Sequence, residues 1–175
     1  MSADIVTRMK PRAFVLCLLL TALTASAFAG EPVVTTVILA RHAEKVDASE
    51  NPDLSAAGEM RAKALAQVLR DVRIDAAYTT PFKRTRKTAE PAAASRGLQP
   101  VEVYADKKLA ENTAARIREQ AGKTILVIGH SNSVPDTIRA LGFKDVPSID
   151  DSEYDRLFIC TLIDGKAASM LALRY

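Results

Sequence analysis

Three short runs of β-branched and apolar residues constrain the fold of this 175-residue chain more than any other feature. They cover residues 33–40, 75–79 and 124–128, and a weaker run covers 101–104. Continuous apolar runs of this length are typical of strands that are buried on both faces of a sheet. Two further strands, at about 154–163 and 167–174, are predicted on either side of Asp164-Gly165, a dipeptide that favours a hairpin turn.

Helical patterns fill the segments between these runs. They cover residues 55–70, 83–95, 107–121 and 133–141. Pro91 lies inside the second pattern, and we expect it to kink or interrupt that helix because proline has no backbone N–H. Strands that alternate with helices predict an α/β three-layer sandwich. Its central sheet is mostly parallel, helices cover both faces, and the C-terminal hairpin forms an antiparallel edge.

The first 29 residues form a segment of a different kind. A basic stretch of Arg8, Lys10 and Arg12 precedes an apolar run at 13–23, and Ala27-Phe28-Ala29 follows it. This order is typical of a cleaved secretory signal, and the apolar run is short for a transmembrane span. We expect a signal peptide at 1–29, starting at Met1 or Met9, and one secreted or periplasmic domain at 30–175. A retained N-terminal anchor is the alternative.

The net charge of +3 belongs mostly to the signal segment. Residues 1–29 carry three basic side chains and one acid, Asp4, so their removal leaves a charge of about +1. This charge favours neither a nucleic-acid partner nor a membrane surface after cleavage. Cys160 is then the only remaining cysteine, which excludes an intrachain disulfide, and its apolar neighbours predict a buried side chain.

Both histidines of the chain follow directly after predicted core strands. Arg41-His42 ends the first strand, and Gly129-His130 ends the strand at 124–128. Thr79-Thr80-Pro81 ends the strand at 75–79, with Arg84 in the next helical turn. In sheets of this type ligands bind beyond the carboxyl ends of the strands, so we expect these side chains to meet there.

Two arginines and two histidines suit phosphoryl transfer. The transferred group spreads negative charge over its oxygens, and guanidinium groups bind such oxygens in pairs. A neutral imidazole nitrogen can act as the nucleophile and form a covalent intermediate. The helix that begins near Ser133 directs its N-terminus to the same place, which also favours an anion. The sequence therefore predicts a phosphoryl-transfer site that uses no metal and no cofactor.

These motifs resemble those of the histidine phosphatase superfamily, the phosphoglycerate-mutase-like group. Residues 39–44 look like its Arg-His-Gly signature, residues 80–85 like its Ser-Pro-x-x-Arg segment, and residues 127–131 like its second histidine motif. Residues 54–58 are similar to its leader into the first helix, so the resemblance covers the chain after residue 29. It implies specific roles for the matched residues. His42 is phosphorylated, Arg41 and Arg84 clamp the phosphoryl oxygens, and His130 hydrogen-bonds to the transferring group.

The chain departs from the family pattern at two places. Ala43 stands where the family has glycine, and we expect a small backbone adjustment there rather than lost activity. Ser131-Asn132 replaces a small glycine-rich pair, and these side chains either contact substrate or cap the next helix. Ser131, Asn132, Thr80 and Glu44 are the predicted substrate-binding residues.

A general acid for the leaving group is not evident in the sequence. Larger family members carry it in an inserted segment after the second arginine motif, where this chain has only a short stretch. Asp106 and Glu111 are the candidate acids and Glu44 is a third, although a solvated surface carboxylate is the simpler interpretation of each. Without an acid, substrates with good leaving groups are favoured, such as a phosphoramidate of histidine.

We therefore expect a phosphatase that transfers a phosphoryl group to His42 and then to water. Its expected partner is a small phosphomonoester or a phosphohistidine. Two alternatives remain open: a non-catalytic module that binds a phosphate ligand, and a phosphoglycerate-type mutase. Export and the absence of a large inserted segment argue against the mutase.

Overall fold

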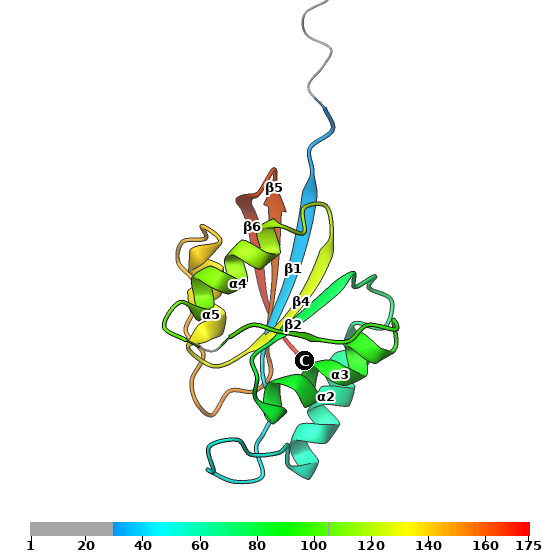
Figure 1. Ribbon diagram of the computed structural model, residues 1–175, viewed down its shortest axis with the longest axis vertical. Coiled ribbons are helices and arrows are strands. Elements are labelled where there is room, and N and C mark those ends of the chain that lie inside the picture. The colour runs from blue at the N-terminus through cyan, green and yellow to red at the C-terminus, as the bar shows by residue number, and fades with distance from the viewer. Residues whose placement is uncertain (1–29, 105) are drawn as a thin grey trace, which may run out of the picture. The chain divides into compact units, whose positions relative to one another are not determined.

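The structure is a computed structural model that describes residues 30–104 and 106–175 (Figure 1). The signal-peptide prediction for 1–29 lies outside these described residues. The compact unit is Pro32–Tyr175. Its elements are β1 (Val34–Arg41), α2 (Ala56–Val68), β2 (Ala76–Thr79), α3 (Lys83–Ala94), β3 (Val101–Glu102), α4 (Leu109–Arg118), β4 (Thr124–Gly129), α5 (Ser133–Ala140), β5 (Arg156–Ile163) and β6 (Lys166–Arg174). No helix in the described part of the chain is long and apolar enough to cross a membrane.

The six strands form one mixed sheet in the order β3-β2-β4-β1-β5-β6. Strands β1 to β4 pair in parallel, whereas β5 pairs antiparallel with β1 and with β6. Asp164 and Gly165, with φ of 50° and 73°, form the two-residue connection between β5 and β6. Positive φ at both positions matches the turn that joins twisted strands most easily. The predicted antiparallel edge hairpin is confirmed.

Helices cover both faces of the sheet, as predicted (Figure 1). Successive side chains of β1 point to opposite faces, so Val37 and Leu39 join one core while Ile38 and Ala40 join the other. The first core includes residues of α4 and α5, and the second includes residues of α2 and α3. Burial on both faces explains why the inner strands read as continuous apolar runs.

The structure differs from the sequence prediction at several element ends. Helix α3 continues through Pro91, so an interruption there, one of the two predicted outcomes, is wrong. Pro91 lies in the last turn, where its missing N–H leaves only one helical hydrogen bond unmade. Helix α4 is shorter than predicted and ends before Gly122, whose φ is 80°. Strand β5 begins at Arg156 rather than 154, which leaves Tyr154 in the preceding loop.

Candidate active site

The carboxyl ends of β1, β2 and β4 bring the predicted site residues together. Strand β4 lies between the other two, with Gly129 paired with Arg41 and Ile128 paired with Thr79. The backbone N–H of His42 donates to the carbonyl oxygen of Gly129 at 2.9 Å. The His42 and His130 rings consequently lie edge to face, with centroids 5.3 Å apart. The prediction that the two histidines meet at one edge of the sheet is confirmed.

His42 is buried, with 4% of its surface exposed. Its Nδ1 lies 2.8 Å from the carbonyl oxygen of Ala43. A carbonyl can only accept, so Nδ1 carries the proton and Nε2 keeps its lone pair. Burial lowers the pKa of His42 from 6.5 to about 3, against the Ala43 hydrogen bond and with help from the positive charge of His130, Arg41 and Arg84. His42 is therefore a neutral imidazole with one nitrogen free to attack.

His130 is held from two sides. Its Nε2 lies 3.0 Å from the hydroxyl of Thr80, and its ring meets the Phe82 ring edge to face at a centroid distance of 5.5 Å. Burial lowers its pKa to about 4, and the charges of Arg84, Arg41 and Lys45 add to the effect. The ring is therefore neutral at pH 7 and fixed in orientation, in a surrounding of positive charge that suits an anion.

Arg41 is anchored by the loop before β5. Its Nη1 donates to the carbonyl oxygens of Asp150, Asp151 and Glu153 at 2.8–3.0 Å, and its guanidinium stacks on the Tyr154 ring at 4.1 Å. Its side chain is 6% exposed. Its Nη2 lies 3.7 Å from a carboxylate oxygen of Asp151. The contacts of Nη1 thus fix the position of the guanidinium, whereas its Nε is buried and has no hydrogen-bond partner among the described residues.

Arg84 approaches from the first turn of α3. Its guanidinium lies over the Phe82 ring at 4.2 Å, and its Nη1 donates to the carbonyl oxygen of Glu50 at 3.1 Å. Burial lowers the pKa of Arg84, although an arginine stays charged at any physiological pH. Arg41 and Arg84 therefore add two fixed positive charges to the pair of neutral histidines.

Glu44 does not face the histidines as an acid. Its carboxylate forms an ion pair with Arg61 of α2, with an Nη2–Oε1 distance of 2.7 Å and two hydrogen bonds from Nε. Burial has the largest single effect and opposes its ionisation, but the hydrogen bonds from Arg61 and from the backbone, together with the charges of Arg61 and Arg41, outweigh burial and hold the pKa of Glu44 below its usual value. The backbone of Glu44 packs against Gly58, where a Cβ would stand 2.2 Å from the Glu44 carbonyl oxygen.

Ala43 fits without strain where the family pattern has glycine. It is fully buried beside Leu54 and Ala62, and its φ is not positive. Its N–H donates to the hydroxyl of Thr88 at 3.0 Å. The backbone next to His42 thus accommodates the extra methyl group, in line with the expected small adjustment.

The other predicted site residues differ in the partners that their side chains contact. The Ser131 hydroxyl donates to Asp151 at 2.8 Å, and Asn132 precedes α5 without making a side-chain cap, so neither residue caps that helix. Asp106 accepts the N–H of Lys108, and Glu111 is exposed in the first turn of α4. Among the described residues, no hydrogen bond or ion pair joins Asp106 or Glu111 to either histidine.

Sequence reasoning missed several residues of the site. Tyr154 lies under Arg41 with its ring centroid 6.1 Å from that of His42, and Phe82 contacts both His130 and Arg84. Thr85 and Thr88 are fully buried on α3 and bond to the site backbone. Thr85 and Thr88 lie three residues apart, on one face of α3, and this spacing was the available signal because polar residues on a buried helix face require partners.

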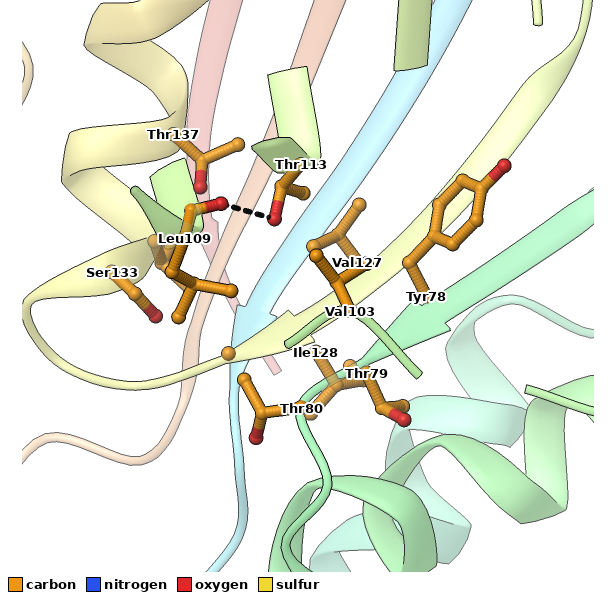
Figure 2. Close-up of a pocket in the computed structure, with 12 residues that line it drawn as sticks. Tyr78, Thr79, Thr80, Val103, Leu109, Thr113, Val127, Ile128, Ser133 and Thr137 are labelled. Carbon is orange, nitrogen blue, oxygen red and sulfur yellow. Dashed lines mark hydrogen bonds between the residues drawn. The ribbon is translucent and has the colours of Figure 1, made fainter. Parts of the chain in front are cut away.

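A small cavity of about 10 Å³ lies behind the strand ends, between the sheet and helices α4 and α5 (Figure 2). Thr80, Thr113, Ser133 and Thr137 contribute hydroxyl groups to its lining. This volume is close to that of one water molecule and far below that of a ligand pocket. The cavity is therefore too small for a phosphorylated ligand, and neither histidine is among its lining residues. The described residues contain no group of three or more His, Cys, Asp or Glu side chains placed to hold a metal ion.

Comparisons with known proteins identify the family and the fold of the chain. Residues 37–126 match the model of the histidine phosphatase superfamily, branch 1. No curated protein sequence matches the chain. An Agrobacterium tumefaciens structure assigned as the phosphohistidine phosphatase SixA is similar over 79% of this chain and 98% of its own, with 22% identity and a TM-score of 0.60.

Two further solved structures share the fold. A protein histidine phosphatase SixA complexed with tungstate has 20% identity and a TM-score of 0.62, over 79% of this chain and 96% of its own. Bacillus stearothermophilus YhfR has 17% identity and a TM-score of 0.63, over 77% and 94% of the two chains. At these identities the similarity establishes the three-layer fold and not the substrate.

Proposed function

The chain belongs to branch 1 of the histidine phosphatase superfamily, and we propose that it is a phosphatase that transfers a phosphoryl group to His42 and then to water. The observation that carries this proposal is the hydrogen bond between His42 Nδ1 and the Ala43 carbonyl. It leaves the Nε2 lone pair of a neutral, buried imidazole beside Arg41, Arg84 and His130. Such a nitrogen is a competent nucleophile at neutral pH.

In the first step, the Nε2 lone pair attacks phosphorus, the N–P bond forms, and the bond from phosphorus to the leaving group breaks. Arg41 and Arg84 neutralise the negative charge on the phosphoryl oxygens, and His130 contributes a hydrogen bond. In the second step, a water oxygen attacks phosphorus and the N–P bond breaks. The electron pair returns to Nε2, the water protons pass to phosphate and solvent, and neutral His42 is regenerated.

The surroundings of the site favour substrates whose leaving group departs without a proton from an acid of the enzyme. Glu44 is held ionised by Arg61, and Asp106 and Glu111 make no hydrogen bond or ion pair with either histidine in the described part of the chain. A phosphohistidine suits this arrangement because its second ring nitrogen takes a proton from solvent and the leaving group departs as neutral imidazole. Similar folds include one protein named as a phosphohistidine phosphatase and one named as a protein histidine phosphatase, the second of them in complex with tungstate. We propose phosphohistidine or a phosphomonoester with a good leaving group as the substrate.

A phosphate-release assay tests the function. Purified protein and its His42→Ala variant are compared on a panel of a phosphohistidine peptide, an aryl phosphate and an alkyl phosphate, with and without a metal chelator. We expect chelator-resistant turnover, fastest on the first two substrates and absent in the variant. Unchanged turnover in His42→Ala would overturn the mechanism, whereas phosphate binding without turnover in both proteins would identify a binding module.

We also propose that the enzyme acts outside the cytoplasm. The basic stretch, apolar run and Ala27-Phe28-Ala29 of the first 29 residues support export and cleavage before Gly30. N-terminal sequencing of the protein recovered from the cell envelope and from the medium of a bacterial expression host tests this. A chain beginning near Gly30 is the expected result, and an intact N-terminus in the cytoplasm would contradict it.

A further inference from the structure

A chain of hydroxyl groups runs from the start of α3 to His130. The Thr85 hydroxyl lies 2.9 Å from the Thr80 hydroxyl, and the Thr80 hydroxyl lies 3.0 Å from Nε2 of His130. Thr85 is completely buried and Thr80 nearly so. Figure 2 shows Thr80 at the end of β2, where the chain leaves the sheet toward α3. Each hydroxyl has protein partners within hydrogen-bond distance, and we take these neighbours as the groups that share its proton.

Thr85 determines which group donates and which accepts in this series of hydrogen bonds. Its hydroxyl lies 2.9 Å from the carbonyl oxygen of Thr80 and 2.8 Å from that of Phe82. Carbonyl oxygens only accept, so the single Thr85 proton is used on them. The Thr85 oxygen is then an acceptor, and the Thr80 hydroxyl donates its proton to it.

Thr80 is left with lone pairs only, and the neighbour that faces them is Nε2 of His130. A contact of 3.0 Å between two acceptors would be repulsive, so Nε2 carries the proton. We infer that Thr85 is a positioning residue that, through Thr80, keeps the proton of neutral His130 on Nε2 and leaves Nδ1 with the lone pair. Nδ1 of His130 has no hydrogen-bond partner among the described residues.

The two histidines are thus set in opposite tautomers. The Ala43 carbonyl keeps the His42 proton on Nδ1, and the hydroxyl chain keeps the His130 proton on Nε2. The Ser133 hydroxyl fixes the backbone of His130 by accepting its N–H at 2.9 Å. For the reaction, and only if the proposed function holds, Nδ1 of His130 is the nitrogen that takes up a proton with the phosphoryl group and then donates to its oxygen.

Thr85 could instead serve only to stabilise the fold, and this alternative leads to a different expected result. Its bonds to the carbonyls of Thr80 and Phe82 also tie the turn after β2 to α3. If that were its whole role, its loss would lower stability and leave the tautomer of His130 unchanged. If the hydroxyl chain sets the tautomer, Thr85→Val leaves the Thr80 hydroxyl to donate to Nε2, which moves the His130 proton to Nδ1.

Two-bond ¹H–¹⁵N spectra of histidine-labelled protein distinguish the tautomers directly, and the sequence has only two histidines to assign. In the unmodified protein at pH 7 we expect His42 with its proton on Nδ1 and His130 with its proton on Nε2. In Thr85→Val we expect His130 to change to the Nδ1–H form while His42 keeps its own. Thr85→Ser, which keeps the hydroxyl, should behave like the unmodified protein.

Thr113→Val is the matched control, because Thr113 is also a buried helical threonine that bonds to a backbone carbonyl, at Leu109. It should leave both tautomers unchanged. We further expect kcat/KM for an aryl phosphate to fall about tenfold in Thr85→Val and to return in Thr85→Ser. A His130 proton on Nδ1 in the unmodified protein, or an unchanged tautomer in Thr85→Val, would overturn the inference. The spectra need no substrate, so their result is independent of whether the protein is a phosphatase.

Discussion

His42 and Gly129 are joined by a backbone hydrogen bond of 2.9 Å between the ends of two neighbouring parallel strands. This bond places His42 beside the residue that follows Gly129, which is His130. The pairing of β1 with β4 therefore builds the two-histidine site, and the side chains around it set protonation and charge.

Arg84→Lys should lower kcat/KM by about 100-fold with little change in stability. Lysine keeps the positive charge but loses the planar pair of donors and the stacking on Phe82 at 4.2 Å. Phosphate-release kinetics measure the effect. Arg86→Lys is the matched control because Arg86 lies on the same helix but forms ion pairs with Glu90 and Glu102 at the surface. Equal rates for the two variants would show that Arg84 does not bind the phosphoryl group.

Tyr154→Leu should lower both stability and activity. The ring of Tyr154 supports the guanidinium of Arg41 at 4.1 Å, a contact worth about 1–2 kcal/mol when it is shielded from solvent. Urea unfolding should show a loss of this size, and kcat/KM should fall about tenfold as Arg41 loses its position. Tyr104→Leu serves as the control, since Tyr104 is 77% exposed. Activity that survives unchanged in Tyr154→Leu would mean that the loop carbonyls alone fix Arg41.

The pH dependence of stability should report the two neutral histidines. Their pKa values fall from 6.5 to about 3 and about 4 on folding, so below pH 6.5 the unfolded chain binds protons that the folded chain does not. The free energy of unfolding should therefore decrease as the pH falls from 6.5 to 5, by up to about 2 kcal/mol for each histidine. Carboxylates with lowered pKa values, such as Glu44, contribute only at lower pH.

Urea unfolding at pH 7 and pH 5 in a phosphate-free buffer measures this decrease, because a bound anion would stabilise the folded state. The double variant His42→Gln, His130→Gln removes both titrating groups and should show a much flatter profile in the same window. A wild-type profile that is already flat between pH 6.5 and 5 would contradict the burial of neutral histidines.

Gly58→Ala should destabilise the protein by about 3 kcal/mol. The added Cβ would stand 2.2 Å from the Glu44 carbonyl oxygen, so α2 or the backbone two residues after His42 has to shift. Thermal unfolding and kcat/KM should therefore decrease together. Ala57→Ser, at the exposed neighbouring position, is the control. A stable and fully active Gly58→Ala would show that the contact between α2 and the strand end is not tight.

The sequence was sufficient to predict the layers of the fold and the position of the site. The continuous apolar runs of β1, β2 and β4 result from burial on both faces, and the polar residues after them mark the edge where ligands bind. Because this information is local, His42, His130 and their two arginines could be found without coordinates.

The partners of these residues were not predictable in the same way. Arg41 is held by backbone carbonyls about 110 residues away, and any residue type can supply a carbonyl. The ion pair of Glu44 with Arg61 removes it as a candidate acid, and this contact between the loop after β1 and α2 depends on the packing of the layers. Side-chain partners of this kind require the tertiary structure.

Capture of the covalent intermediate tests the account most directly. The protein is mixed with a phosphoryl donor labelled with ³²P, quenched in alkali, where phosphohistidine is stable, and digested for peptide mapping. We predict a label on the peptide that contains His42 and no label in His42→Ala. The label should disappear when the labelled protein is separated from the donor and incubated in buffer before the quench. Steady turnover with no label on His42, or a label that persists in His42→Ala, would contradict the account.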